Sequence, residues 1–343
     1  MKFFSVIVIA FLVLSACTKK ANVEIQAQKA YSQGLEYYNK GGESNLLQAI
    51  EYFSKSIEID SNFALAYASL ANTYSSIGGG YNILAPEETW PKAKEAAEKA
   101  LALDKELPEA YSALAHVKIG YEWNWAGAEE EFKRALELKP NSVDILLEYA
   151  WFLNRINRPN EALALAEKAQ ESDPHSPPVT AYMNFHFGET EKTKQLVKKK
   201  LDSDPQNPYL HWRISVIYTK EGLYEEAEKH LIIQIPLMNG DVVDEVALLG
   251  HVYGRMGRKE EAMKQLVKLD ELSEKGRYVS PVLKAWIYSG LSEKDEAIAW
   301  LQKGYENHAH RMGLGLISFN FLFEPIRNDP RFKELLQKMN LES

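Results

Sequence analysis

Residues 46–60 read LLQAIEYFSKSIEID, and this phrase recurs in recognisable form down the chain. Its alanine marks a position that is occupied by a small residue at each recurrence. The recurring positions are Ala49, Ala93, Ala128, Ala162, Thr193, Ala227, Ala262 and Ala297. They are spaced by 44, 35, 34, 31, 34, 35 and 35 residues. A period near 34 residues predicts an array of repeated helix pairs.

Two patterns within each period identify the kind of repeat. Residues 128–140 (AEEEFKRALELKP) give the second-helix pattern most completely, and residues 67–74 (YASLANTY) give a first-helix pattern. Together they resemble the tetratricopeptide repeat (TPR), over about residues 25–305. The resemblance implies an all-α fold: a right-handed TPR superhelix, or α-solenoid, of about eight helix pairs with a C-terminal helical cap.

The small residues have a steric role in such an array. Two helices pack 8–10 Å apart only where small side chains meet, so Ala or Gly is needed where the helices of a pair cross. Larger side chains such as Leu70, Tyr74 and Phe132 would then fill the gaps between pairs.

Two longer phrases narrow the resemblance. Residues 121–128 (YEWNWAGA) and residues 325–336 (PIRNDPRFKELL) are similar to phrases in the TPR arrays of bacterial adenylate cyclases and winged-helix regulators. The present chain lacks the cyclase and DNA-binding domains of those proteins, so the resemblance implies the array and not their activities.

Three segments depart from the regular repeat. The 44-residue interval contains a glycine triplet, so we expect an insertion loop near residues 78–90 that is mobile or shaped by a partner. The fifth pair, residues 177–203, is short and begins with two prolines, which predicts an irregular pair and a change of curvature between two lobes. Residues 306–343 are expected to form C-terminal capping helices over the exposed face of the last pair.

The N-terminus indicates a membrane anchor. Lys2 precedes an apolar stretch, residues 3–14, that is too short to span a bilayer and is typical of a signal peptide. Residues 14–17 (LSAC) resemble the lipobox of bacterial lipoproteins, and Cys17 is the only cysteine of the chain. The resemblance implies cleavage of residues 1–16, acylation (palmitate-type lipidation) of Cys17, and a polar tether over residues 17–24.

This anchor places the mature protein at a membrane surface. Each buried acyl methylene contributes about 0.8 kcal/mol, so two or more chains hold a protein durably. We therefore expect a lipid-anchored protein of the cell envelope. Thr18, which is not aspartate, favours the outer membrane facing the periplasm in a Gram-negative host.

Composition and motifs argue against other functional classes. The chain has 343 residues and a formal net charge of -8, which disfavours a nucleic-acid surface. Its eight histidines are scattered, and no zinc motif, phosphate loop or nucleophile elbow is present in the sequence. We therefore expect no enzymatic activity, no cofactor and no metal site.

The concave face of the array is the expected binding surface. In the family register, residues one position after the small Ala or Gly of each first helix should face the groove. The predicted peptide-binding residues are Asn72, His116, Trp151, Trp212, Arg213, Val216, His251 and Trp286. Aromatic and Arg anchors dominate binding energy, so these positions predict a groove for protein or peptide partners. Each Trp could instead pack against the neighbouring repeat.

The leading interpretation is a protein–protein interaction scaffold or assembly factor. The alternative is a small-molecule binder or unrecognised enzyme that uses a pocket near residues 78–90 and His116. A deep pocket with convergent ionisable groups would favour that alternative, whereas an open groove would favour a scaffold. A sensory ligand module is a third possibility, but it would need a coupled signalling domain.

Overall fold

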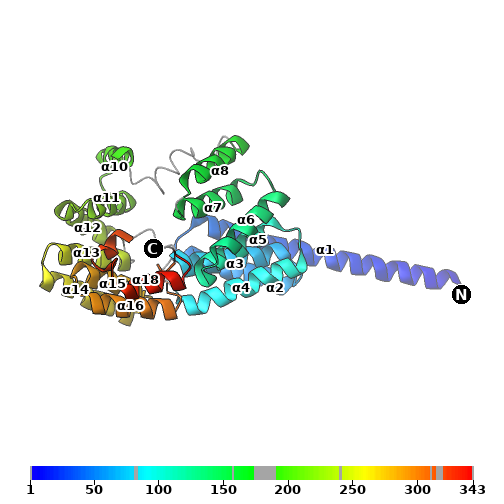
Figure 1. The fold of residues 1–343 in the computed structure, drawn as a ribbon. Coiled ribbons are helices and arrows are strands. Elements are labelled where there is room, and N and C mark those ends of the chain that lie inside the picture. Colours follow the sequence, from blue (N-terminus) through cyan, green and yellow to red (C-terminus); the bar gives the residue numbers. More distant parts are fainter. Residues whose placement is uncertain are drawn as a thin grey trace.

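A computed structural model describes residues 2–80, 84–156, 158–173, 191–238, 242–309, 311–313 and 320–341. All regular elements in these ranges are helices, which are connected by short turns (Figure 1). The predicted all-α class is therefore confirmed.

Consecutive helices pack against each other in pairs, as helical hairpins, along the chain. In the first half the pairs are α1 (Lys2–Lys40) with α2 (Glu43–Ile59), α3 (Ala64–Gly80) with α4 (Pro86–Leu103), α5 (Pro108–Val117) with α6 (Trp125–Leu138), and α7 (Val143–Arg155) with α8 (Pro159–Ser172). In the second half they are α11 (Pro208–Lys220) with α12 (Tyr224–Leu237), α13 (Val243–Arg255) with α14 (Lys259–Glu274), and α15 (Pro281–Gly290) with α16 (Lys294–Glu306). The helix α10 (Glu191–Ser203) lies at the position of a second helix between these halves.

The repeated small residues lie where the hairpins touch. All eight landmark positions, which belong to the second helices, have an exposed fraction of 0% or 1%. First helices of neighbouring pairs also approach closely. A Cβ atom at Gly290 of α15 would lie 2.5 Å from the carbonyl oxygen of His251 on α13. The period therefore reflects a steric requirement, as the sequence predicts.

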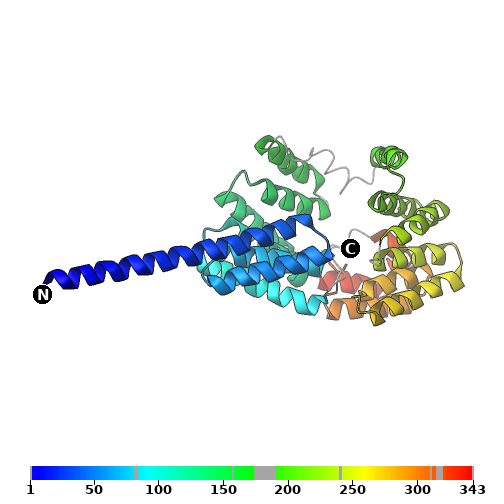
Figure 2. The same cartoon turned by 180° about the vertical axis from the view of Figure 1, so that it is seen from behind.

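The hairpins form two lobes, the N-terminal lobe (residues 2–173) and the C-terminal lobe (residues 191–341), as Figure 1 and Figure 2 show. One large core cluster extends through the C-terminal lobe from Val197 to Leu341, and separate clusters fill the N-terminal lobe. The irregular fifth pair was expected near this boundary, but its residues 177–190 lie outside the described ranges.

The C-terminal segment packs on the last pair and then reaches the N-terminal lobe. The short helices η2 (Asn320–Ile326) and α18 (Pro330–Lys338) contact α15 and α16. Beyond α18, the indole nitrogen of Trp125 donates a hydrogen bond to the carbonyl oxygen of Met339, at 2.9 Å. The Asn340 side chain donates to the carbonyl oxygen of Trp123, at 3.2 Å. The cap therefore joins the two lobes.

A second contact joins the lobes elsewhere. The Arg277 guanidinium, after α14, forms a two-pronged ion pair with the Glu43 carboxylate at the start of α2. These residues are separated by 234 positions in the chain. The array therefore closes on itself and does not end in a free cap.

The glycine triplet differs from the expected insertion loop. Gly78 and Gly79 lie inside α3, and α4 already begins at Pro86, while residues 81–83 lie outside the described ranges. The triplet provides space for Trp90 of α4. A Cβ atom at Gly78 would lie 2.5 Å from the Thr89 hydroxyl and 3.1 Å from the Trp90 ring. Most of the predicted loop near residues 78–90 is therefore helical, because close packing and not mobility requires the glycines.

The N-terminal helix α1 projects from the N-terminal lobe (Figure 2). It includes residues 17–24, the predicted tether, as continuous helix. Among the described residues, no helix combines the length and apolarity needed to cross a membrane.

Candidate functional site

Three of the predicted groove residues line one cavity. Asn72 on α3, His116 on α5 and Trp151 on α7 occupy equivalent places on successive first helices and face the same hollow. Trp212 and Arg213 on α11 are half-buried and do not line this cavity. The structure therefore brings the N-terminal members of the predicted groove together at one cavity and places Trp212 and Arg213 elsewhere.

The last two predicted residues are not at a surface. His251 and Trp286 are 2% and 0% exposed, and Nδ1 of His251 donates a hydrogen bond to the carbonyl oxygen of Trp286, at 2.9 Å. They fill the interface between α13 and α15, which approach closely at Gly290. The prediction that His251 and Trp286 face a peptide is therefore wrong, as is that for Val216, which is 5% exposed.

The cavity lies where the two lobes meet. Its volume is about 400 Å³, and its walls come from α1, α3, α4, α5, the π-helical turn η1 (Lys118–Glu122), α7, and Ala309, Arg311 and Met312 of the other lobe. It occupies the place that the small-molecule alternative predicted, beside Gly78 and His116.

A carboxylate and an imidazole form the polar centre of the wall. Oε2 of Glu148 accepts a hydrogen bond from the Ser112 hydroxyl and lies 3.5 Å from Nε2 of His116. Burial would raise the pKa of Glu148, but hydrogen bonds from His116 and Ser112 and the charge of His116 outweigh it and lower the pKa. Glu148 is therefore an ionised acceptor at neutral pH.

The His116 ring is oriented by aromatic neighbours. It meets the Phe132 ring edge-on, with centroids 5.7 Å apart, and its centroid is 6.5 Å from that of Trp151. Packing therefore fixes the imidazole in place beside Glu148.

Two buried oxygen atoms of the wall have no hydrogen-bond partner among the described residues. They are Oδ1 of Asn72 and Oγ of Ser75, one turn apart on α3. Ser75 is only 6% exposed. Nearby, the Tyr38 and Ser76 hydroxyls lie 3.5 Å apart. Leaving a buried acceptor unsatisfied costs about 1–3 kcal/mol, so these atoms indicate a missing donor.

Two guanidinium groups complete the polar lining. The Arg155 guanidinium lies over the Trp151 ring, 5.1 Å from its centroid. Arg311, from the C-terminal lobe, forms an ion pair with Asp244, with Nη2 and Oδ2 2.5 Å apart. Each cation is therefore held by a group of the protein.

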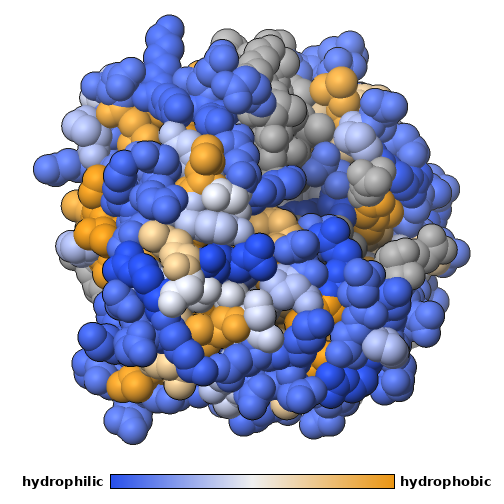
Figure 3. Space-filling view, turned by 60° about the vertical axis from the view of Figure 1, so that its left-hand side comes forward, coloured by the Kyte–Doolittle hydropathy of each residue, from blue (hydrophilic) through white to orange (hydrophobic). Residues whose placement is uncertain are grey.

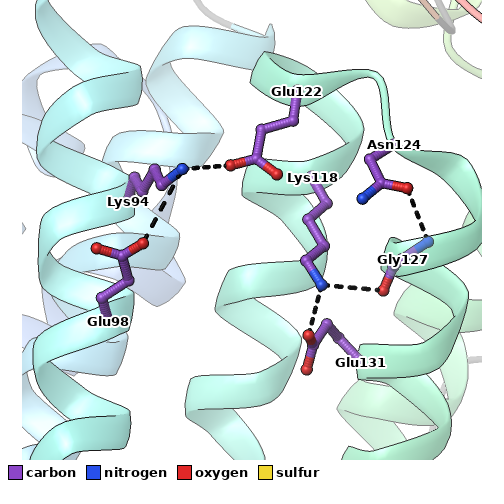
Figure 4. A network of polar contacts seen from close by, with 7 residues as sticks. All are labelled: Lys94, Glu98, Lys118, Glu122, Asn124, Gly127 and Glu131. Carbon is purple, nitrogen blue, oxygen red and sulfur yellow. Dashed lines mark hydrogen bonds and ion pairs between the residues drawn. The ribbon is translucent and has the colours of Figure 1, made fainter.

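The turn η1 positions the contact between the lobes. Lys94 bonds to Glu122 at 2.5 Å and Lys118 bonds to Glu131 at 2.6 Å, which ties η1 to α4 and α6 (Figure 4). Asn124 then caps α6 by accepting a hydrogen bond from the Gly127 amide, at 3.0 Å. Between the ion pairs of η1 and the Asn124 cap, Trp123 adopts a left-handed backbone conformation with φ 48°.

Trp123 inserts into the C-terminal lobe. Its ring stacks on His308 and Tyr305, with centroids 4.6 and 5.1 Å away, and is 5% exposed. Burial lowers the pKa of His308, although a backbone hydrogen bond at Tyr121 opposes this. The neutral imidazole is therefore part of an aromatic stack that joins the two lobes.

The groove register missed several residues that line the cavity. Ser75 and Glu148 lie one turn from Asn72 and Trp151, so helical spacing could have included them. Arg311 and Met312 come from the other lobe, and no local pattern connects them with His116. Among the described residues, no group of three or more His, Cys, Asp or Glu side chains could hold a metal ion.

Outside this cavity the visible surface is mainly polar. Figure 3 shows a face dominated by hydrophilic residues, with apolar side chains in small separate patches. Scattered apolar patches of this kind are usual on protein surfaces.

The stacked hairpins define an α-solenoid with a partly open cavity where its two lobes meet. Family models of the tetratricopeptide repeat match residues 124–182 and 247–275. The chain therefore contains tetratricopeptide repeats in these two segments. Comparison with curated proteins gave no significant match.

Solved structures that match this chain include three of different origin. A hetero-tetramer of the APC/C proteins Cut9 and Hcn1 matches with a TM-score of 0.50 and 12% identity, over 86% of this chain and 52% of that chain. Yeast Tom70 matches with a TM-score of 0.49 and 18% identity, over 91% of this chain and 67% of that chain. PilF of Pseudomonas aeruginosa matches with a TM-score of 0.38 and 21% identity, over 62% of this chain and 92% of that chain. At these identities the likeness concerns the fold alone.

Proposed function

We propose that this protein is a lipid-anchored scaffold or assembly factor of the bacterial cell envelope that holds segments of other proteins. The observation that carries the proposal is the position of Trp151, Trp212 and Arg213. They lie on first helices of both lobes and remain partly exposed. Solenoids use such concave faces as extended binding surfaces.

Trp and Arg are the residues best suited to this role. A partly exposed Trp offers a large apolar area with few rotatable bonds, and alanine scanning finds Trp, Tyr and Arg most often among the residues that dominate binding energy. Trp151 also has the Arg155 guanidinium over its ring, which holds the ring in one orientation. Binding without chemistry is the activity that we propose for this face.

The anchor follows from the N-terminal sequence. Cleavage before Cys17 and acylation of that residue would attach the chain to a membrane, and Thr18 favours the outer membrane facing the periplasm. Helix α1 would then separate the repeats from the lipid surface.

Photo-crosslinking in living cells tests the scaffold. A photoreactive phenylalanine analogue replaces Trp151 or Trp212, and the control places it at Trp300, a half-buried Trp on the second helix α16. We expect defined protein adducts from positions 151 and 212 and none from position 300. Equal adducts at all three positions, or none at any, would contradict a concave binding face.

A further inference from the structure

The cavity has the size of a small-ligand site. Its volume of about 400 Å³ falls in the range of about 300–1,000 Å³ that is usual for such sites. Helices of the N-terminal lobe form most of the wall, and Ala309, Arg311 and Met312 of the other lobe close it. This partly enclosed shape suits a compact molecule better than an extended peptide.

The unsatisfied atoms specify what the ligand must offer. Oδ1 of Asn72 accepts hydrogen bonds only, and Oγ of Ser75 can accept or donate. Ser75 is 94% buried, so bulk water does not hydrate it freely. A ligand that places donor groups beside these two atoms would satisfy both.

Two charged groups of the wall, Glu148 and Arg311, already have polar partners in the protein. Glu148 is hydrogen-bonded by Ser112 and faces His116, and Arg311 is paired with Asp244. A charged ligand would have to compete with one of these pairs, because an uncompensated charge in a partly enclosed site is costly. The cavity therefore favours an uncharged ligand.

The remaining wall is aromatic and aliphatic. Trp90 is nearly buried, whereas Trp151 and Tyr38 are half-buried and present ring surface to the hollow. Ile119 and Met312 add apolar area. The ligand should therefore combine an apolar face with several hydrogen-bonding groups at its edge.

We propose that the cavity binds a neutral sugar of one or two rings. A pyranose presents C–H groups on its faces and hydroxyls around its edge. Each hydroxyl can donate to Asn72, Ser75 or Glu148 and accept from a donor such as Tyr38. Because both lobes contribute to the wall, the bound sugar also links them. This site goes beyond the protein-binding function and does not depend on it.

Titration calorimetry of the full-length protein tests the proposal. The protein is kept in lauryldimethylamine oxide, a detergent without a sugar headgroup, and titrated with glucose, N-acetylglucosamine and cellobiose. Glucosamine, galacturonate and the uncharged dipeptide N-acetyl-Gly-Asn amide serve as comparison ligands. We expect saturable binding of at least one neutral sugar and weaker binding of the charged sugars and the peptide.

Two variants locate the binding. Ser75→Ala and Asn72→Ala remove the unsatisfied acceptors, and each should weaken the sugar about tenfold, the effect of losing one buried hydrogen bond. Ser75→Ala should not lower the melting temperature of the free protein, because its hydroxyl has no partner to lose. The controls are Ser172→Ala and Trp300→Ala, which lie away from the cavity and should bind like the parent.

Three results would overturn the proposal. They are the absence of binding by every neutral sugar at millimolar concentration, binding that Ser75→Ala and Asn72→Ala leave unchanged, and preferential binding of the peptide or of a charged sugar. None of them affects the crosslinks expected from position 212, so failure of the sugar site and failure of the scaffold are distinguishable.

Discussion

Individual side chains on first helices fall into two groups with different roles. Asn72, His116 and Trp151 face the cavity, as the repeat register predicts. His251 and Trp286 occupy the same register but are buried between α13 and α15. The register gives the face of a helix, whereas exposure depends on how closely the next helix approaches. That distance depends on Gly290 and Gly254, which belong to neighbouring helices.

The buried His251 makes stability depend on pH. Burial lowers its pKa to about 4, against an ordinary value of 6.5 in the unfolded chain. Between these two pKa values, His251 is protonated in the unfolded state and neutral in the folded state. The unfolded state therefore binds more protons as the pH falls below 6.5. Stability should fall as pH drops, by about 2 kcal/mol between pH 7 and pH 5 from this residue.

Urea unfolding followed by circular dichroism measures this dependence. His251→Asn retains a donor for the Trp286 carbonyl oxygen but cannot be protonated, so its stability should fall less between pH 7 and pH 5. His230, whose pKa is also lowered to about 4 by burial and by His211, accounts for part of the remaining slope. An identical pH slope in His251→Asn and the parent would contradict this account.

At the scale of helices, the recurring small residue determines the fold. Its eight occurrences are all buried, although the intervals between them vary. Helix pairs could therefore be predicted from the sequence. The sequence could not show that the glycine triplet belongs to a helix, because a glycine triplet is typical of a loop. Only the position of Trp90 against Gly78 and Gly120 shows why these residues are glycine.

Enlarging a landmark alanine should destabilise the array. Ala128→Leu adds three carbon atoms to a fully buried position on α6, and overpacking of this kind typically costs about 1–3 kcal/mol. Ala126→Leu is the matched control, because Ala126 is exposed on the same helix. Thermal unfolding should show a clear loss for Ala128→Leu and little change for Ala126→Leu. Equal effects would mean that Ala128 is not at a tight crossing.

At the scale of the whole molecule, closure of the array was not predictable. Residues 121–128 and 325–336 were both recognisable as distinctive phrases, and the structure brings their neighbourhoods together. Trp123 and Trp125 contact Tyr305, His308, Met339 and Asn340. No periodic pattern encodes a contact across about two hundred residues. The sequence predicted a cap over the last pair, but not that this cap also joins the first lobe.

Anchoring of the whole molecule depends on one atom in our proposal. Cys17→Ser removes the sulfur that would be acylated. We expect the variant to be lost from the membrane fraction of cells, whereas the parent stays in it. The reason is that a chain without acylation has no acyl chains to bury in the membrane. Thr18→Ser is the control and should remain with the membranes. A membrane-bound Cys17→Ser protein would show that another feature anchors the chain.

The most direct test of the closed array is a crosslink between its lobes. Cysteines replace Glu43 and Arg277, which form an ion pair across the lobes, in the Cys17→Ser chain, and a short bis-maleimide is added. A second pair at Lys194 and Glu221, within the C-terminal lobe, is the positive control. Closure predicts efficient intramolecular crosslinking at both pairs, seen as a mobility shift on denaturing gels. Crosslinking at 194 and 221 without any at 43 and 277 would mean that the lobes stand apart.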